Sequence, residues 1–284
     1  MSATVAQVSA AMVEQALGAC SEVRPEGAWR WSGSGQNGRR RRFTASFAEG
    51  FLHLLGEAAP LREAGQLQRA LAAGGRGPVK PTLNRERSAL VPRADLLAAD
   101  AGQLRQRLLW ALDGLQHAGE APAAATADST AADGGLSEAL REAAWPATEV
   151  SGGGYVFDLG LAAAPPARLT AHGGEQAISV ELARGAAPGE IASRALAVYL
   201  LSASRELRLV RAYAATAGGQ WSCGFQAPLA AAPLAAELDA ALAALTVAFQ
   251  CCWRETEVLR DENAARQYLA VRSLTTLNDQ AGKE

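Results

Sequence analysis

The sequence lacks the short motifs that mark common phosphate-binding and catalytic sites. It contains no G-x-x-x-x-G-K-[ST] loop and no G-x-S-x-G turn. Two glycine clusters are present, Ser32–Gly38 and Ser151–Gly154, but both lead into predicted strands. A phosphate-binding loop needs a helix N-terminus behind it, and a nucleophile elbow needs a strand-to-helix turn. We therefore interpret the glycine clusters as hairpin connections.

Histidine and cysteine are also scarce. The histidines contain no i, i+4 pair of the kind that binds zinc on a helix, and the cysteines form no C-x-x-C pair. Free buried thiols in a reducing compartment explain this pattern better than a disulfide framework. No catalytic, metal-binding or cofactor-binding residue is predicted. The residues concerned are His53, His117 and His172, and Cys20, Cys223, Cys251 and Cys252.

The chain has little net charge, −2 overall, so its charge predicts neither nucleic-acid nor membrane binding. Residues 1–120 carry a net +4 and residues 121–284 a net −6. The densest charge run, Arg39–Arg42, leads into a strand and is interpreted as a solvated face rather than a contact site. There is no basic segment followed by an apolar core at the start, and charges and prolines interrupt the most apolar stretch, 227–252. We expect a cytoplasmic protein without membrane insertion.

Hydrophobic periodicity predicts the following order of elements in the first 118 residues. A helix is expected over 4–19, strands over 40–56, a second helix from Pro60 to the Gly74–Gly75 stop, and a hairpin over 79–97. A long helix containing Leu104–Leu115 then completes this half.

A second set of elements follows residues 119–135, which contain no bulky apolar residue and are interpreted as a flexible linker. The expected elements are a short helix over 136–145, strands over 155–159 and 177–182, a helix after Pro188, a hairpin over 207–225 and a long final helix after Pro233 towards Tyr268. The predicted organisation is thus two α+β modules, 1–118 and 136–272, joined by the linker and followed by a tail, 273–284.

The two modules share a leucine register. Three apolar positions of the first long helix, Leu104, Leu108 and Leu115, lie 134 residues before Leu238, Leu242 and Phe249. Alanine-rich helices can align through composition alone, so the order of elements is the stronger argument. We interpret the chain as an internal duplication of an antiparallel sheet packed with helices, forming an internal pseudo-dimer.

Each half resembles the small α+β module of class I type III secretion chaperones and of the related YbjN-like proteins. The resemblance depends on the last strand pair running into a leucine helix: Arg93–Leu97 before Leu104–Leu115, and Trp221–Phe225 before Leu238–Phe249. It implies a bacterial, non-enzymatic binding protein that holds an extended segment of a client protein. The chain departs from the family in two respects. It has two modules where class I chaperones typically have one, and its charge is near neutral where theirs tends to be acidic.

Candidate client contacts are the strand aromatics Phe43, Phe47, Trp221 and Phe225, for which burial in a core is the competing interpretation. Two other functions remain open. One is an enzyme with an unrecognised site, using His53 or Cys223, and the other is a structural or regulatory subunit of a larger assembly. A homodimer is a further possible assembly beside the internal pseudo-dimer.

Overall fold

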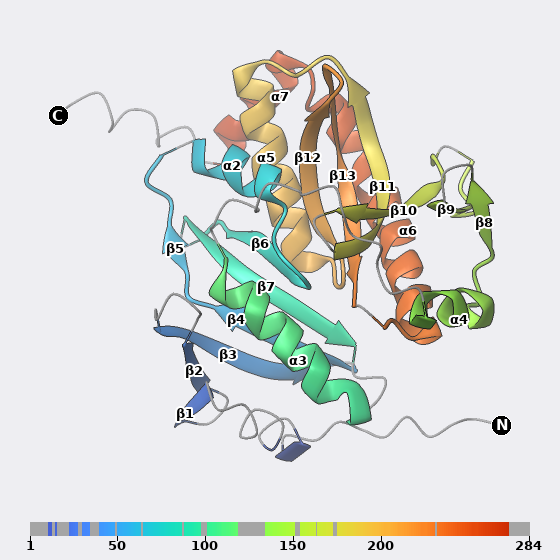
Figure 1. The fold of residues 1–284 in the computed structure, drawn as a ribbon. Coiled ribbons are helices and arrows are strands. Elements are labelled where there is room, and N and C mark those ends of the chain that lie inside the picture. The colour runs from blue at the N-terminus through green and yellow to red at the C-terminus, as the bar shows by residue number, and fades with distance from the viewer. Residues whose placement is uncertain are drawn as a thin grey trace.

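The computed structural model contains two antiparallel sheets that lie one above the other, each packed with helices (Figure 1). The fold is α+β, as the sequence predicted. The structure describes residues 11–12, 15, 23–27, 30–34, 40–48, 50–63, 65–86, 88–97, 101–118, 134–150, 154–162, 164–172, 175–230 and 232–272. The predicted helix at 4–19 lies almost wholly outside these residues, as do the predicted linker up to residue 133 and the tail at 273–284.

The first sheet comes from the first half of the chain. Its strands are β1 (Val23–Gly27), β2 (Arg30–Ser34), β3 (Arg40–Ala48), β4 (Phe51–Gly56), β5 (Ala59–Pro60), β6 (Val79–Asn84) and β7 (Ala89–Leu97). They run in the order β1-β2-β3-β4-β7, with β6 on the far side of β7 and short β5 paired with the start of β7. Helix α2 (Gly65–Ala73) precedes β6, and α3 (Ala101–Gln116) follows β7.

The second sheet comes from the second half. Its strands are β8 (Ala147–Val150), β9 (Gly154–Phe157), β10 (Ala167–His172), β11 (Glu175–Gly185), β12 (Arg211–Ala217) and β13 (Gln220–Leu229). They run in the order β8-β9-β10-β11-β13-β12. The helices are α4 (Gly134–Glu142) before β8, α5 (Glu190–Glu206) before β12, and α6 (Ala235–Val258) and α7 (Glu262–Val271) after β13.

The two sheets have the same strand order. In each, four successive strands form a meander, a helix follows, and a hairpin then returns with its second strand beside the fourth. Strand β7 corresponds to β13, and edge strand β6 corresponds to β12. The leucines of the shared register are buried in both long helices, α3 and α6. This correspondence agrees with a duplication, which itself stays an interpretation.

The hairpin and helix predictions agree with the structure where glycine punctuates the chain. Helix α2 ends before Gly74 and Gly75, which have φ of +65° and +99°, a conformation that residues with a side chain disfavour. Gly218 and Gly219, also at positive φ, make the tight turn between β12 and β13. In both places the sequence signal was the glycine pair itself.

Three boundaries differ from the sequence prediction. Pro60 ends β5 rather than beginning a helix, because the chain first pairs with β7 and enters α2 only at Gly65. Residues 207–209 are not strand, and β12 begins at Arg211. The last helix does not continue to Tyr268 unbroken: α6 ends at Val258, and Asp261 then caps α7 by accepting from the backbone N–H groups of its first turn. Strands β1, β2, β5, β8 and β10 were missed.

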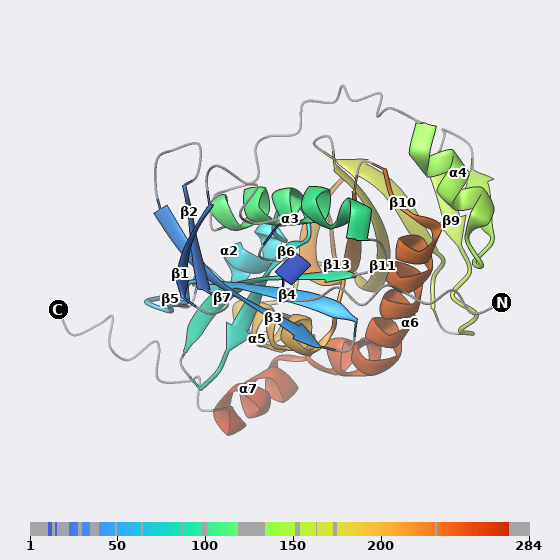
Figure 2. The same cartoon turned by 90° about the horizontal axis from the view of Figure 1, so that it is seen from below.

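The described residues form two hydrophobic cores that do not follow the halves of the sequence. One joins the first sheet to α3. The other joins the second sheet to α4, α5, α6 and α7, and it also contains Leu67 and Leu71 of α2 and Leu83 of β6. Helix α2 accordingly lies beside α5 (Figures 1 and 2). The first half therefore contributes a helix to the core of the second.

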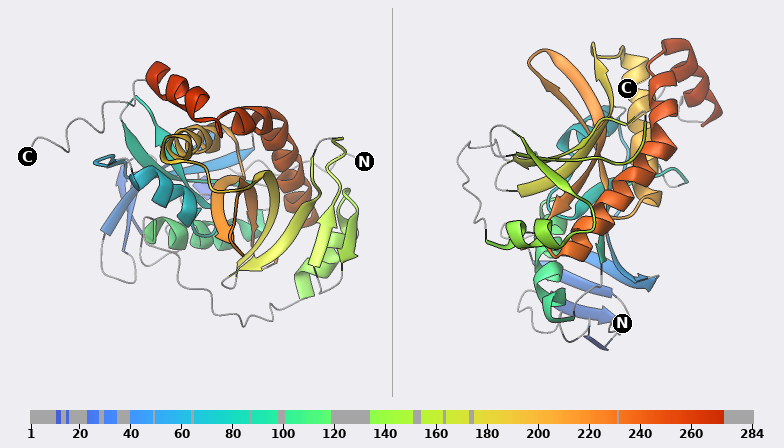
Figure 3. Two further views of the ribbon diagram at one scale, coloured as in Figure 1. Left: turned by 90° about the horizontal axis from the view of Figure 1, so that it is seen from above. Right: turned by 90° about the vertical axis from the view of Figure 1, so that its right-hand side faces the viewer.

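Helix α6 is long and apolar enough to cross a membrane by length and composition, with a mean hydropathy of 1.4. Its apolar residues Leu238, Leu242 and Leu245 are fully buried against β11 and β13. Figure 3 shows α6 running along one side of the second sheet. Buried core helices of globular proteins share this composition.

Candidate functional site at the junction of the two halves

The end of α5 is bound by two cationic side chains from the first half. Lys80 of β6 donates to the backbone oxygen of Leu207, and Arg93 of β7 donates through Nη1 to the backbone oxygen of Arg205 at 2.8 Å. The last carbonyls of a helix have no partner within it and carry partial negative charge. The two cations therefore satisfy these carbonyls and join the halves.

Asp95 links these cations within the first sheet. Its carboxylate lies 2.6 Å from Lys80 Nζ, 2.7 Å from Arg93 Nε and 2.6 Å from His53 Nδ1, and its side chain is fully buried. Asp95 stands between Ala94 and Leu96 on β7. Since successive strand residues face opposite sides, these neighbours face α3 while Asp95 faces α5. We call His53, Lys80, Arg93 and Asp95 the junction network.

Burial and neighbouring charges shift the pKa values of this network in opposite directions. Burial alone would raise the pKa of the Asp95 carboxyl, but the adjacent Lys80, His53 and Arg93 together hold that pKa well below its usual range. Burial lowers the pKa of the Lys80 ammonium, against the opposing attraction of Asp95. The direct contact of Lys80 with Asp95 keeps the carboxylate ionised. A buried charge group of this kind is costly unless all its partners are present.

A second buried ion pair joins the two long helices. Arg107 of α3 donates through Nε and Nη2 to the two carboxylate oxygens of Glu237, both at 2.6 Å. Nη2 also donates to the backbone oxygen of Ala232 and to Gln103. Glu237 in turn accepts from the backbone N–H of Leu234 at the start of α6. This forked geometry is the strongest form of an arginine–carboxylate pair.

A fourth cation crosses the junction in the opposite direction. Arg211, the first residue of β12, donates through Nη1 to the backbone oxygen of Gly77 at 2.8 Å and pairs with Glu175 at 3.0 Å. Gly77 lies in the α2–β6 loop, just as Leu207 lies in the α5–β12 loop. Lys80 and Arg211 stand near the starts of corresponding strands. Each half thus places a cation on the loop carbonyl of the other.

A pocket lies where the halves meet, between the β7–α3 and β13–α6 connections. Its volume is about 50 Å³. Its polar lining residues are Asp95, Arg107 and Glu237. The apolar ones are Pro78, Leu96, Leu97, Trp110, Leu209, Pro228, Leu229, Ala230 and Ala241. We call this the junction pocket.

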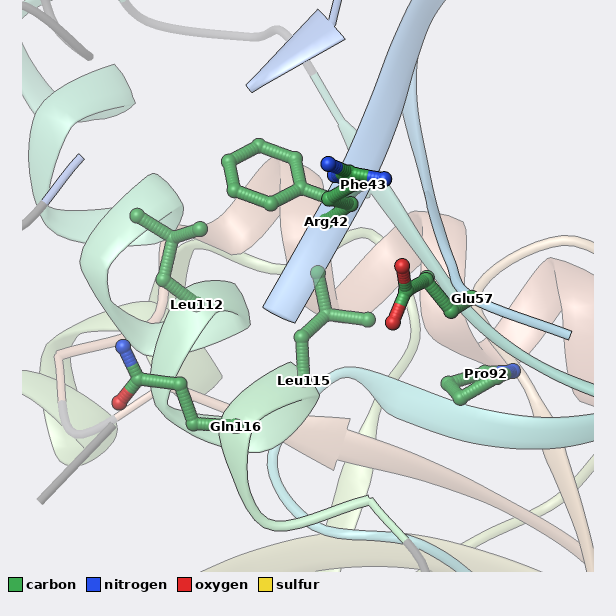
Figure 4. Close-up of a pocket in the computed structure, with 8 residues that line it drawn as sticks. Arg42, Phe43, Glu57, Pro92, Leu112, Leu115 and Gln116 are labelled. Atoms are coloured by element: carbon green, nitrogen blue, oxygen red, sulfur yellow. The ribbon is translucent and has the colours of Figure 1, made fainter. Parts of the chain in front are cut away.

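A smaller pocket of about 20 Å³ lies between the first sheet and the end of α3 (Figure 4). Phe43, Leu112 and Leu115 line its apolar side, and Arg42 and Glu57 lie at the other side. Small-molecule sites usually have volumes of roughly 300–1,000 Å³. Both pockets are therefore sized for a side chain or a few waters.

The predicted client contacts fall into two groups. Phe43 and Phe225 are buried, Phe43 stacked on Trp31 with ring centroids 6.0 Å apart and Phe225 within the second core. Phe47 and Trp221 are half-buried against the cores. The structure does not bring these four together into one surface. Phe47 and Trp221 present more surface to a client than Phe43, which lines the smaller pocket, or Phe225, which is fully buried.

The cysteines and histidines are dispersed. Burial raises the pKa of Cys223 to about 12 and that of Cys252 to about 11, so both thiols resist ionisation, whereas Cys251 is exposed. His117 donates through Nδ1 to the backbone oxygen of Asp113 at 2.8 Å near the end of α3. Among the described residues, no group of three or more histidine, cysteine or acidic side chains is placed to hold a metal ion.

The pairing of His53 with Asp95 resembles catalytic geometry. A histidine oriented by a carboxylate can act as a general base. Here, however, Arg93 Nη2 lies 3.2 Å from the same ring nitrogen, and His53 lines neither pocket. The contacts of His53 are those of a structural member of the junction network. The sequence signal was the run Phe51–Leu55, in which apolar residues flank His53 on both sides, as in a strand buried on both faces.

Comparisons with protein-family models, with curated proteins and with solved structures found no match to this chain.

Proposed function

We propose that this chain is a non-enzymatic binding protein that holds an extended segment of a client polypeptide, with its two halves forming an internal pseudo-dimer. The observation that carries the proposal is the outer edge of the second sheet. Among the described residues, strand β8 pairs only with β9, and three of its four residues are exposed, including Val150. Figure 3 places β8 at the periphery of the molecule. An unpaired strand edge is a template for an added strand.

The opposite edges of the two sheets, formed by β6 and β12, differ from the β8 edge. Edge strand β6 packs against α5, and edge strand β12 lies beside α2, so both of these edges are covered within the chain. The resemblance to type III secretion chaperones and YbjN-like proteins, which implies client binding, agrees with this arrangement. A role as a subunit of a larger assembly would use the same edge.

Peptide binding with hydrogen exchange as the readout tests this proposal. Peptides selected from a random library on the full chain are added to the protein, and amide exchange is followed in β8. We expect protection of at least one amide within Thr148–Val150 to rise about tenfold or more, because an added strand supplies hydrogen-bond partners. Unchanged exchange in β8 with bound peptide would exclude this edge, and a failure to select any peptide would exclude the function.

A further inference from the structure

Arg107, which lines the junction pocket, has a buried donor without a partner. Two nitrogens of the Arg107 guanidinium are used by Glu237, Gln103 and Ala232, but Nη1 is buried and has no hydrogen-bond partner among the described residues. Only 4% of Arg107 is exposed. Leaving a buried donor unsatisfied costs about 1–3 kcal/mol, and more for a charged group. An acceptor that enters this pocket would remove that cost.

The acceptor has to be neutral. The positive charge of Arg107 is already matched by Glu237, and that of Lys80 by Asp95. An anionic ligand would therefore lie beside two carboxylates, Asp95 and Glu237, and one cation, Arg107, because Lys80 and Arg93 do not line the pocket. A backbone carbonyl accepts a hydrogen bond without adding charge.

The remaining surface of the pocket suits a short aliphatic side chain. The floor is apolar, with Leu96, Leu229 and Ala230 buried, and the rim is half-exposed at Leu97, Trp110 and Pro228. A volume of about 50 Å³ holds roughly three to five water-sized atoms at 10–15 Å³ each. That matches the three or four carbons of valine or leucine and is too small for an aromatic ring.

The backbone at the rim is strained. Leu209, which lines the pocket, has φ of +60°, a conformation that costs a leucine about 1–2 kcal/mol. It lies just after Leu207, whose carbonyl Lys80 holds, and beside Arg208, whose guanidinium stacks 4.9 Å from the Phe51 ring. Strain maintained by surrounding contacts is a feature of binding sites.

The pocket is also where the two halves differ. Corresponding positions of the halves, 133 or 134 residues apart, line it together: Leu96 and Leu229, Asp95 and Pro228, and Arg107 and Ala241. The apolar pair is alike, whereas Asp95 and Arg107 of the first half have uncharged counterparts, and the charged lining residue of the second half is Glu237. Because the unpartnered donor is on one side, a ligand would bind in one orientation.

We propose that the junction pocket binds an aliphatic side chain of valine or leucine size from the client segment, with a neighbouring backbone carbonyl accepting from Arg107 Nη1. This inference rests on the proposed function and names the residue type that the client presents. The site is separate from the β8 edge and combines groups of both halves.

The pocket is tested with a ligand too small to add a strand. The labelled full chain is titrated with N-acetyl-leucine methylamide while NMR follows the Trp110 indole and the Arg107 guanidinium. We expect saturable shifts with a Kd on the order of 1 mM, as a ligand of this size allows. N-acetyl-glycine methylamide, which lacks the side chain, and N-acetyl-leucine, which carries a carboxylate, should bind at least about tenfold more weakly. Equal binding of all three, or no saturable shift, overturns the proposal.

Three variants locate the binding. Ala230→Leu fills the pocket and should weaken binding of the leucine amide at least about tenfold, whereas the same substitution at exposed Ala243 of α6 should leave it unchanged. Arg107→Lys keeps a cation beside Glu237 but removes the guanidinium donor, and should weaken binding about tenfold. Thermal unfolding verifies that each variant folds. Unchanged binding in Ala230→Leu contradicts the assignment.

The same variants separate the two proposals. If selected peptides bind Ala230→Leu as well as the original chain, the pocket proposal fails and client binding at the β8 edge stands. If the leucine amide binds but no selected peptide does, the pocket is a small-ligand site and the proposed function fails.

Discussion

The two halves share a strand order but differ in the residues that cover the faces of their sheets. The first sheet has one apolar face against α3, while its other face carries Lys80, Asp95 and His53 against the end of α5. The second core is a larger hydrophobic cluster that includes α2 from the first half. The first half therefore depends on the second to satisfy its charges, and the second depends on the first to cover its apolar surface. Two similar modules have become one interlocked unit.

Removing the carboxylate of the junction network should have the largest effect. Asp95→Ala leaves Lys80 and Arg93 buried without their counter-charge, so we expect the free energy of unfolding to fall by about 3–5 kcal/mol. Urea denaturation followed by circular dichroism measures this. The control is Asp113→Ala, which breaks a largely exposed pair with Arg76 and should cost no more than about 1 kcal/mol. Equal losses in the two variants would contradict the network's role.

The contribution of Asp95 to stability should decrease in acidic solution. The pKa of Asp95 is depressed in the folded protein, so its stabilising contribution is fully present above the ordinary aspartate pKa of about 3.9. It is lost as the pH falls below that value. The stability gap between the original chain and Asp95→Asn should therefore be constant from about pH 5 to 7 and narrow in more acidic solution.

Truncation in α2 tests the dependence in the other direction. Leu67 is fully buried in the second core although it belongs to the first half, and Leu67→Ala should lower the free energy of unfolding by about 2–5 kcal/mol. Leu109→Ala, at an exposed position of α3, should change it by no more than about 0.5 kcal/mol. A loss below about 1 kcal/mol for Leu67→Ala would show that α2 is peripheral to the second core.

Relieving the strained residue of the α5–β12 loop should have the smallest effect. Leu209→Gly removes the cost of φ +60° and should raise the free energy of unfolding by up to about 1 kcal/mol. Leu207→Gly is the matched control: its φ of −82° suits leucine, so glycine there should lower stability by about 0.5–1 kcal/mol. The two changes should differ in sign in the same denaturation measurement.

The sequence predicted the elements that local signals define. The leucine register located α3 and α6, and the glycine pairs located the end of α2 and the β12–β13 turn. These features depend on residues within a few positions of each other. Strand β8, only four residues long, carries no such signal and was missed.

The junction was beyond sequence reasoning because its members are far apart in the chain. Lys80 meets Leu207 across 127 residues, and Arg107 meets Glu237 across 130. A lone lysine or arginine in a strand or helix ordinarily indicates a solvated face. The apolar neighbours on both sides of His53 and Asp95 were the only local sign that these strands are covered on both faces. Which groups cover them depends on how the halves dock.

Native-state hydrogen exchange tests the central claim, that the halves form one cooperative unit, most directly. The slowest-exchanging amides of β7 and of β13 report the opening of the first and second sheets separately. If the halves are interlocked, both sets should exchange with the same free energy, equal to that of global unfolding. If either sheet opens at a free energy about 2 kcal/mol or more below the other, the halves unfold independently and the account is wrong.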